Sequence, residues 1–389
     1  MSYITEKDNE FVAGTYARFP VEIVSGKGSY LYGSDGKEYI DLGSGIGVTA
    51  FGIADPTWIK AVTEQLNKVQ HASNLYYTEP CALLAEKLCA VTGMKKVFFG
   101  NSGAEANECA VKVARKYAQD KKGMEYGTIV TLKNSFHGRT LTTLAATGQD
   151  VFHTKFLPLT PGFISVPAGD LAQAKEAIGN NKVAGVLIEC VQGEGGVIPQ
   201  EKDYVCGLYQ LCRENDVLFM VDEVQTGNGR TGKPYAYMNY GVKPDVVTTA
   251  KGLGGGLPIG ACIIGEKAES VLGKGDHGST FGGNPIACAG ALTVLDRLTD
   301  DLMKEVNEKS AYLFEKLGSC EGIESVTGKG LMIGFKPKTK SAKEVVLACM
   351  EKGVLCLTAK DKVRLLPALN IPFDVLKKAV DVILDVCRK

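Results

Sequence analysis

Two charged segments stand directly after hydrophobic runs in the middle of the sequence. In VLFMVDEVQTG, Asp222 and Glu223 end one run, and in DVVTTAKGLGGG, Lys251 comes two residues after the next. At the ends of consecutive strands, a lysine and a carboxylate suit a cofactor with an aromatic nitrogen: the lysine forms an imine, and the carboxylate keeps the ring nitrogen protonated. Either segment alone is more typical of a solvated loop, but the two in succession favour a cofactor site.

A third segment, FFGNSGAEANE, predicts a helix that starts where a strand ends. Ser102 can cap the helix and Glu105 can close a capping box. Because Gly103 and Ala104 leave the first backbone amides uncovered, the same helix N-terminus could hold a phosphate dianion. The residues alone leave both interpretations open.

Other segments indicate chemistry only weakly. In NSFHGRTL, Phe136 could lie flat on a heterocycle and Arg139 could clamp a carboxylate, although a surface arginine is an equal alternative. Further polar residues in loops or short segments are Glu194 in QGEGG, Ser279 and Thr280 in GSTFGGNP, and Arg364 in RLLPAL. The glycines of KGLGGG are not a nucleotide loop, because no GK[ST] ending and no G-x-G-x-x-G follows, and this disfavours an ATPase.

The elements that must position these residues are short apolar runs alternating with helical periodicity. The runs are KVFF near 97, TIVTL near 129, VAGVLIE near 185, VLFMVDE near 219, DVVTT near 247 and ACIIG near 262. Such runs predict a mostly parallel sheet buried on both faces, with ligand sites at the carboxyl ends of its strands. The pattern is α/β.

The two chain ends have a different pattern. YLYGSDGKEYIDL predicts a hairpin around Asp35-Gly36 that comes before any helix. After about residue 290 the pattern becomes a helix, a hairpin (SVTGKGLMIGF), another helix and a final amphipathic helix. We therefore expect a large α/β domain at 52–290 and a smaller α+β domain formed by 1–51 and 291–389.

Composition limits the class of partner. Lys plus Arg and Asp plus Glu both total 44 in 389 residues, so no overall field favours nucleic acid or an anionic membrane. A small-molecule partner is the better expectation. The opening MSYITEKDNEF has no apolar run, which predicts neither a secretory signal nor a membrane span, and hence a cytoplasmic protein. Twelve scattered cysteines and four histidines predict no metal site and no disulfide framework.

Taken together, the segments resemble the subgroup III aminotransferases of fold type I, from about residue 15 to the end. The blocks that carry the resemblance are HASNLYYTEP, NSGAEANE, SFHGRTL, DEVQTGNGRTGK, AKGLGGGLPIGA and TFGGNP. The resemblance implies a pyridoxal 5′-phosphate enzyme whose large domain holds a mostly parallel seven-stranded sheet. It is strongest to members that move the δ-amine of N2-acetyl-L-ornithine to 2-oxoglutarate in arginine biosynthesis.

The resemblance also implies roles around the cofactor. Lys251 is similar to the Schiff-base lysine and Asp222 to the residue that pairs with the pyridine nitrogen. Gln225 would reach the ring hydroxyl, and Val224 would pack under the ring opposite Phe136. The phosphate cup is implied to consist of Ser102, Gly103 and Ala104, completed by Thr280 of the neighbouring subunit. The site would then exist only in a homodimer.

For the substrate, Arg139 resembles the arginine that binds the far carboxylate, and Ser279 would help to hold acetylornithine. Glu194 and Arg364 resemble a switch in which Glu194 neutralises Arg364 until the carboxylate of 2-oxoglutarate displaces it. Ile46 stands where relatives that act on ornithine have a tyrosine, which favours an acylated or absent α-amine. A place in the core is the alternative for Ile46.

Several alternatives remain at this point. Succinylornithine or 4-aminobutyrate aminotransferases would share every residue named, and a non-catalytic binding protein could keep the fold. Two departures from the family pattern also stand in the chain: GIADP, where relatives carry histidines, and Glu189-Cys190, where they carry Glu-Pro. The missing proline predicts a looser turn that could slightly misplace Glu194.

Overall fold

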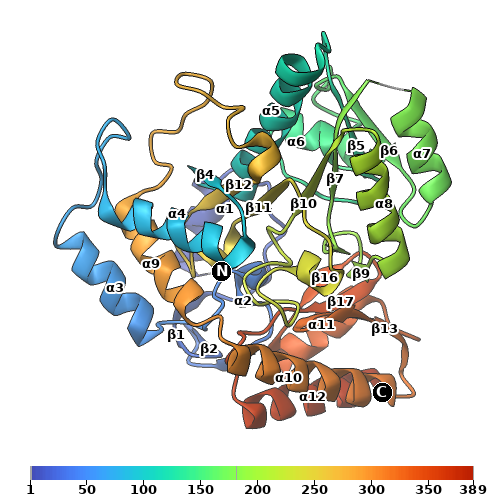
Figure 1. Ribbon diagram of the computed structural model, residues 1–389. Helices are drawn as coiled ribbons and strands as arrows, with labels where there is room; N and C mark the ends of the chain where they lie inside the picture. The colour runs from blue at the N-terminus through green and yellow to red at the C-terminus, as the bar shows by residue number, and fades with distance from the viewer. Residues whose placement is uncertain (1, 181, 389) are drawn as a thin grey trace.

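The computed structural model describes residues 2–180 and 182–388 and divides into two layered regions (Figure 1). The upper region in this view is built on a seven-stranded sheet. Its strands run in the order β4 (Lys96–Gly100), β12 (Gly260–Ile264), β11 (Val246–Thr249), β10 (Leu218–Asp222), β7 (Val183–Ile188), β5 (Thr128–Leu132) and β6 (Phe163–Val166). Only β12 is antiparallel to its neighbours in the sheet, so the prediction of a mostly parallel sheet of seven strands is confirmed.

Helices cover both faces of this sheet. They are α3 (Pro56–Leu66), α4 (Glu79–Thr92), α5 (Gly103–Lys122), α6 (Leu141–Ala146), α7 (Leu171–Asn180), α8 (Lys202–Glu214) and α9 (Pro285–Asp296). Alternate residues along the strands point to opposite faces: Leu218 and Met220 pack in one cluster with residues of α5, and Phe219 and Val221 pack in another with residues of α8. Burial on both faces explains why the sequence of these strands is continuously apolar.

The lower region contains two small sheets and three helices (Figure 1). One sheet has the order β1 (Ile23–Lys27), β2 (Tyr30–Gly33), β3 (Glu38–Asp41) and β15 (Val354–Leu355), and the other has β13 (Ile323–Lys329), β14 (Met332–Pro337), β17 (Lys362–Leu365) and β16 (Leu357–Ala359). The helices are α10 (Asp300–Gly318), α11 (Ala342–Glu351) and α12 (Phe373–Arg388). The parallel pairing of β15 with β3 joins the two ends of the chain, and Leu42 and Phe51 share a core cluster with residues of α10, α11 and α12.

Three features differ from the expected pattern. A helix, α1 (Tyr3–Phe11), precedes the first hairpin, so the expectation of a sheet before any helix is wrong. Its side chains are not buried, and the apolar periodicity that normally reveals a packed helix is weak there. The strands β1 and β6 were not predicted either, since each is short and lacks a fully buried apolar run. Short elements α2 (Ser44–Gly47), β8 (Val191–Gln192) and β9 (Ile198–Pro199) complete the fold.

The described residues contain no helix that is both long and apolar enough to cross a membrane. They also contain no group of three or more His, Cys, Asp or Glu side chains placed to hold a metal ion. All twelve cysteines are free thiols.

Candidate active site

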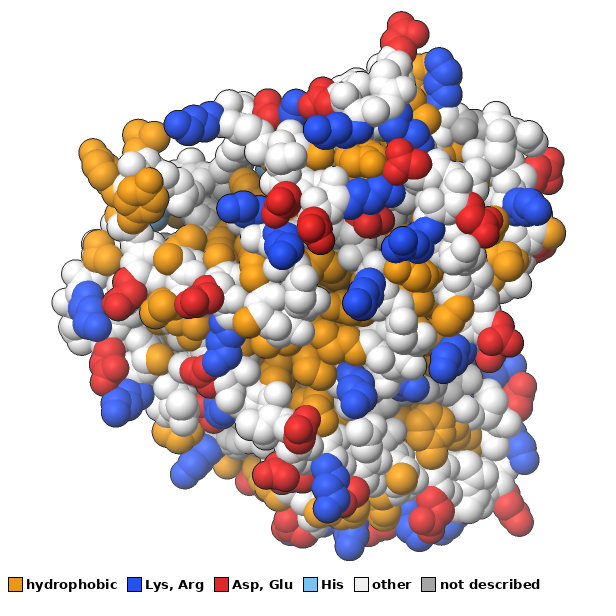
Figure 2. Space-filling view, in the orientation of Figure 1, with side chains coloured by type: hydrophobic (Ala, Val, Ile, Leu, Met, Phe, Trp, Pro, Cys, Tyr) orange, Lys and Arg blue, Asp and Glu red, His pale blue; other side chains and the backbone are white. Residues whose placement is uncertain are grey.

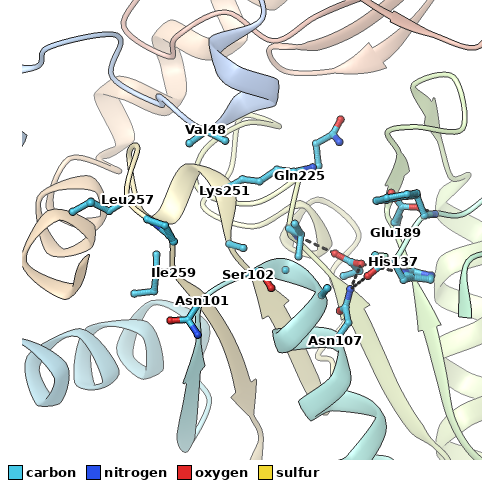
Figure 3. A pocket seen from close by; sticks show the side chains of 18 of the residues that line it. Val48, Asn101, Ser102, Asn107, His137, Glu189, Gln225, Lys251, Leu257 and Ile259 are labelled. Atoms are coloured by element: carbon cyan, nitrogen blue, oxygen red, sulfur yellow. Dashed lines mark hydrogen bonds and ion pairs between the residues drawn. The ribbon is translucent and has the colours of Figure 1, made fainter. Parts of the chain in front are cut away.

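A cavity of about 340 Å³ opens at the carboxyl ends of the central strands, beside the N-terminus of α5 (Figure 3). This volume suits a small cofactor with its substrate. The lining residues are Val48, Asn101, Ser102, Gly103, Ala104, Asn107, Phe136, His137, Gly138, Glu189, Asp222, Val224, Gln225, Ala250, Lys251, Gly256, Leu257, Pro258 and Ile259. Eight of the residues that sequence reasoning selected for the cofactor therefore line one cavity: Lys251, Asp222, Val224, Gln225, Phe136, Ser102, Gly103 and Ala104.

Lys251 follows β11 and reaches across the cavity toward Gln225 (Figure 3). Its backbone φ is +44°, which strains a residue with a Cβ and is often found where a side chain is aimed at a ligand. Burial is the main cause that lowers the pKa of the Lys251 amine, while the charge of Glu194 opposes the shift. A lowered pKa raises the fraction of neutral, nucleophilic amine near pH 7.

Asp222 ends β10 and is held by three hydrogen bonds. Its Oδ2 accepts from Asn107 Nδ2 at 2.8 Å and lies 2.8 Å from His137 Nδ1, and its Oδ1 accepts from the Val224 amide at 3.0 Å. The Asp222 residue is only 4% exposed. Asn107 is itself fixed, because its Oδ1 accepts from Thr248 on the neighbouring strand at 2.7 Å. The carboxylate is therefore pre-oriented and faces the cavity with a fixed charge.

The N-terminus of α5 forms another wall of the cavity. Ser102 caps the helix, its Oγ accepting from the Glu105 amide at 3.2 Å, so the predicted cap is present. A Cβ on Gly103 would come within 2.6 Å of Val224 Cγ1, so glycine is required for the helix to pack this closely on Val224. Free amides at a helix N-terminus, together with small side chains, form a surface on which a phosphate can sit.

Glu194 and Arg364 form an ion pair next to the cavity. Arg364 Nη1 lies 2.6 Å from Glu194 Oε1 and donates to Gln225 Oε1 at 3.1 Å, while Gln225 Nε2 donates to Glu194 Oε1 at 3.3 Å. Burial acts to raise the pKa of Glu194, but the charge and hydrogen bond of Arg364 outweigh it and lower that pKa. Arg364 is 3% exposed, so an unpaired Arg364 would be costly by several kcal/mol at a rough estimate. Arg364 should therefore leave Glu194 only when another anion takes its place.

Phe136 lines the cavity and Arg139 lies outside the lining residues. The Arg139 guanidinium lies over the Phe152 ring at 4.3 Å and near the Phe136 ring at 5.5 Å. The two rings meet edge to face with centroids 6.0 Å apart. Arg139 is exposed, and within residues 2–180 and 182–388 its guanidinium lies against ring faces and not against a carboxylate, so a ligand could reach its hydrogen-bond donors.

Six predicted substrate or cofactor residues do not line the cavity within one chain: Arg139, Glu194 and Arg364, described above, and Ile46, Ser279 and Thr280. Ile46 has a φ of +67° and is 40% exposed, so the alternative that it belongs to the core is wrong; its neighbour Val48 lines the cavity instead. Ser279 Oγ accepts from Asn101 Nδ2 and from the Gly282 amide, which ties its loop to the cavity rim. Thr280 is exposed and lines a separate groove with His71 and Asn74.

Sequence reasoning missed three buried polar residues of the cavity wall: Asn107, His137 and Glu189. Asn107 lies on the buried face of α5, whose other residues are mostly apolar. His137 directly follows Phe136, in a segment that the sequence analysis had already selected. The signal was present in SFHG and NSGAEANE, but only the tertiary fold brings Asn107 and His137 to Asp222. The glycines after Lys251 were also interpreted incompletely: a Cβ on Gly254 would meet Leu257 O and one on Gly255 would meet Trp58, so chain packing requires them.

The Glu194 loop is well placed although Cys190 stands where the family resemblance led us to expect a proline. The carbonyl of Cys190 accepts from the Gln200 amide at 2.9 Å and from Tyr240 Oη at 3.1 Å. These bonds, and the 2.6 Å contact of Glu194 with Arg364, show that the expected misplacement of Glu194 does not occur.

Glu223 is a second buried carboxyl beside Asp222, directed away from the cavity. Its Oε1 accepts from the Tyr237 amide at 2.8 Å and its Oε2 accepts from Thr226 Oγ1 at 2.5 Å. Burial raises its pKa from 4.5 to about 7, against the lowering effect of these bonds. Because the folded pKa lies above the ordinary value, stability from this group is complete below pH 4.5 and is lost as the pH rises through about 7.

The replacement Glu223→Gln should therefore flatten the pH dependence of stability. The amide resembles the protonated carboxyl, and Thr226 can reverse its hydroxyl to accept. Between about pH 5 and 7, the wild-type free energy of unfolding should fall more steeply than that of the variant, by up to about 1.4 kcal/mol per pH unit from this group. Urea denaturation at several pH values measures both slopes, and equal slopes would contradict the assignment.

Comparison with known proteins gives a consistent family. The Aminotransferase class-III family matches residues 11–387. An acetylornithine aminotransferase of Haemophilus ducreyi is 49% identical over 384 residues, covering 98% of each chain, and a succinylornithine transaminase of Salmonella agona is 44% identical over 390 residues, covering 98% of this chain and 95% of the relative.

A solved structure agrees with these sequence relatives. The ornithine aminotransferase of Toxoplasma gondii, which has partial occupancy of pyridoxal phosphate at its active site, matches with a TM-score of 0.94 and 30% identity. The match covers 99% of this chain and 94% of that one. The fold and the cavity at the strand ends thus lie in a scaffold that binds this cofactor in a relative.

Proposed function

Because this chain belongs to the class-III aminotransferases, we propose that it moves the δ-amino group of N2-acetyl-L-ornithine to 2-oxoglutarate. The products are N-acetyl-L-glutamate 5-semialdehyde and L-glutamate. The observation that carries this choice is the closed pair of Glu194 with Arg364 at the cavity edge, 2.6 Å apart. While Glu194 neutralises Arg364, Arg364 cannot bind an α-carboxylate. The site then accepts a donor whose reacting amine is at the end of the molecule remote from its α-carboxylate.

The residues of the cavity fit pyridoxal 5′-phosphate. Asp222 offers a fixed anion for a ring nitrogen, Lys251 offers an amine, and the uncovered N-terminus of α5 offers amides for a phosphate. When bound, the cofactor supplies an aldehyde for condensation with amines and a cationic ring that accepts the charge developing on the substrate carbon.

Lys251 and Asp222 carry the chemistry in this proposal. Burial lowers the pKa of the Lys251 amine, and in this proposal Lys251 Nζ takes a proton from the substrate carbon that bears the amine and later returns one. Asp222, held by Asn107 and His137, would hold the ring nitrogen and keep it protonated through its negative charge. Phe136, Val224 and Gln225 all line the cavity; Phe136 and Val224 would lie on the two sides of the ring, and Gln225 would reach the ring hydroxyl.

Two arginines, Arg139 and Arg364, hold the carboxylates of the substrates in this proposal. We assign Arg139, exposed beside the rings of Phe136 and Phe152, to the carboxylate of the acylated donor. The incoming acceptor has two carboxylates, and its α-carboxylate displaces Glu194 from Arg364, so that the buried arginine always has an anionic partner. Ile46 offers no hydrogen bond to a free α-amine, which favours a donor whose α-amine is acylated.

The functional unit in this proposal is a homodimer. Thr280 is exposed outside the cavity of its own chain, and Ser102 at the cup is exposed as well. Large apolar side chains lie exposed in the loops that precede α4 and α9: Leu75, Tyr76, Tyr77 and Phe281. The loops are tied together by Asn74 Nδ2, which donates to Ser279 O and Gly282 O. Apolar side chains gather at the upper left of Figure 2, over the loop that leads into α4.

A second copy would cover that apolar surface and bring the partner subunit's Thr280 to the phosphate cup. If sedimentation velocity shows a monomer in a sample that is fully active, the homodimer is contradicted. For the compartment, we place the enzyme in the cytoplasm as part of arginine biosynthesis. Its twelve free thiols suit a reducing compartment.

A substrate panel tests the function. With 2-oxoglutarate as acceptor, kcat/KM for N-acetylornithine should exceed the values for ornithine and 4-aminobutyrate by at least about tenfold, since each rival leaves a polar group unpaired or a contact empty. The Salmonella relative makes N-succinylornithine the second candidate, and a higher kcat/KM for that donor would favour it. Preference for ornithine would contradict the role given to Ile46.

A further inference from the structure

Glu189 is a buried carboxyl in the cavity wall to which the mechanism above gives no role. It follows β7, lines the cavity and is 5% exposed. Its two oxygens serve different parts of the site: Oε2 accepts from the Phe136 amide at 2.9 Å, and Oε1 accepts from the Gly193 amide at 3.2 Å. Figure 3 shows Glu189 on the same side of the cavity as His137, across from Ile259. One side chain thus joins the ring-stacking segment to the start of the Glu194 loop.

The loop is fixed on both sides of Glu194. Gly193 packs so closely on Gln225 that a Cβ would lie 2.4 Å from Gln225 Oε1. Beyond Glu194, the Gly195 carbonyl accepts from Asn134 Nδ2 at 2.7 Å. The backbone of the loop is therefore held by Glu189 at Gly193 and by Asn134 at Gly195. Only the side chain of Glu194 has to move when Glu194 leaves Arg364.

We propose that Glu189 is a positioning residue that sets donor specificity by holding the backbone of Gly193, and with it the register of Glu194 against Arg364. The inference rests on the proposed switch between Glu194 and Arg364. If the hydrogen bond from Gly193 to Glu189 is lost, Glu194 neutralises Arg364 less completely, and Arg364 then binds the α-carboxylate of unwanted α-amino donors.

The first test is Glu189→Gln. An amide has one accepting oxygen, and its NH₂ group faces a backbone N–H, so one of the two bonds must break. In the single half-reactions, the ratio of kcat/KM for glutamate to kcat/KM for N-acetylornithine should rise about tenfold. In hydrogen exchange of the protein without added cofactor, the peptide containing Gly193 should exchange at least about tenfold faster than in the wild type.

Glu223→Gln is the matched control, because Glu223 is also a buried carboxyl at a strand end, and its oxygens accept from Thr226 and the Tyr237 amide instead of the Glu194 loop. It should leave both the ratio and the exchange of the Gly193 peptide unchanged. A second variant, Asn134→Gly, removes the hydrogen bond from Asn134 to Gly195 while suiting the φ of +72° at that position. It should raise the ratio about threefold, which keeps the test decisive should Glu189→Gln fold poorly.

A double variant separates positioning from a general effect on folding. In Glu194→Gln, the ratio is already raised, so adding Glu189→Gln should change it less than twofold if Glu189 acts through Glu194. Additive effects, or an unchanged ratio in both Glu189→Gln and Asn134→Gly, would overturn the inference. If instead the wild-type half-reactions fail to prefer N-acetylornithine as δ-amine donor, the proposed function fails independently of Glu189.

Discussion

Replacement of Lys251 by alanine should lower kcat/KM for the N-acetylornithine half-reaction by about 10⁴-fold or more, with the cofactor still bound. The methyl side chain offers neither a nucleophile for the aldehyde nor a base for the substrate carbon, and the two losses act on the same steps. Asp222 and the N-terminus of α5 still hold pyridoxal phosphate, because neither depends on Lys251 for its hydrogen bonds. Stopped-flow absorbance measures the rate, and equilibrium dialysis measures the bound cofactor.

A matched control is Lys309→Ala. Lys309 is also buried, and its Nζ donates to Leu369 O and pairs with Glu305, remote from the cavity. It should lower stability with little change in activity per folded molecule. Near-normal turnover in Lys251→Ala would refute the role of that amine.

The second large effect is expected for Asp222→Asn, a loss of about 10²–10³-fold in kcat with little change in fold. Asparagine keeps the shape, but its single oxygen can accept from either Asn107 or the Val224 amide and not from both, and it carries no charge to hold a proton on the ring nitrogen. The developing negative charge on the substrate carbon then has no cationic ring to enter. The absorbance spectrum of the bound cofactor should shift as well, which separates this effect from misfolding.

Asp245→Asn is the control for Asp222. Asp245 precedes β11 at the opposite edge of the same sheet, where its Oδ2 accepts from the Phe219 amide at 2.9 Å. It should leave kcat within about twofold, because it lies at the wrong end of the strands to face the cavity. A similar loss in both variants would show that any change of charge in this sheet harms activity.

Much of the fold could be predicted from the sequence because its strands carry an unambiguous pattern. Buried parallel strands such as β7 and β10 are continuously apolar, and a strand end followed by Asp222 or Lys251 fixes where the site must lie. The exposed helix α1 and the short strand β6 carry no such pattern. Their existence depends on contacts that only the folded chain supplies.

The sequence predicted the part of the candidate site that follows from secondary structure and missed the part that depends on tertiary contacts. Residues at strand ends or helix starts, such as Lys251 and Ser102, were found because their positions follow from secondary structure. Asn107 and Glu189 were missed because their partners, Asp222 and Gly193, reach them through helix packing and loop geometry that no local pattern encodes. Thr280 lies outside the cavity of its own chain, and its proposed role depends on a second chain.

Reduction of the holoenzyme with borohydride, followed by peptide mass spectrometry, tests the central claim most directly. The account predicts one pyridoxyl group per chain, attached to the peptide that contains Lys251, and none in Lys251→Ala. Attachment to a different side chain, or no attachment in a protein that still turns over N-acetylornithine, would contradict it.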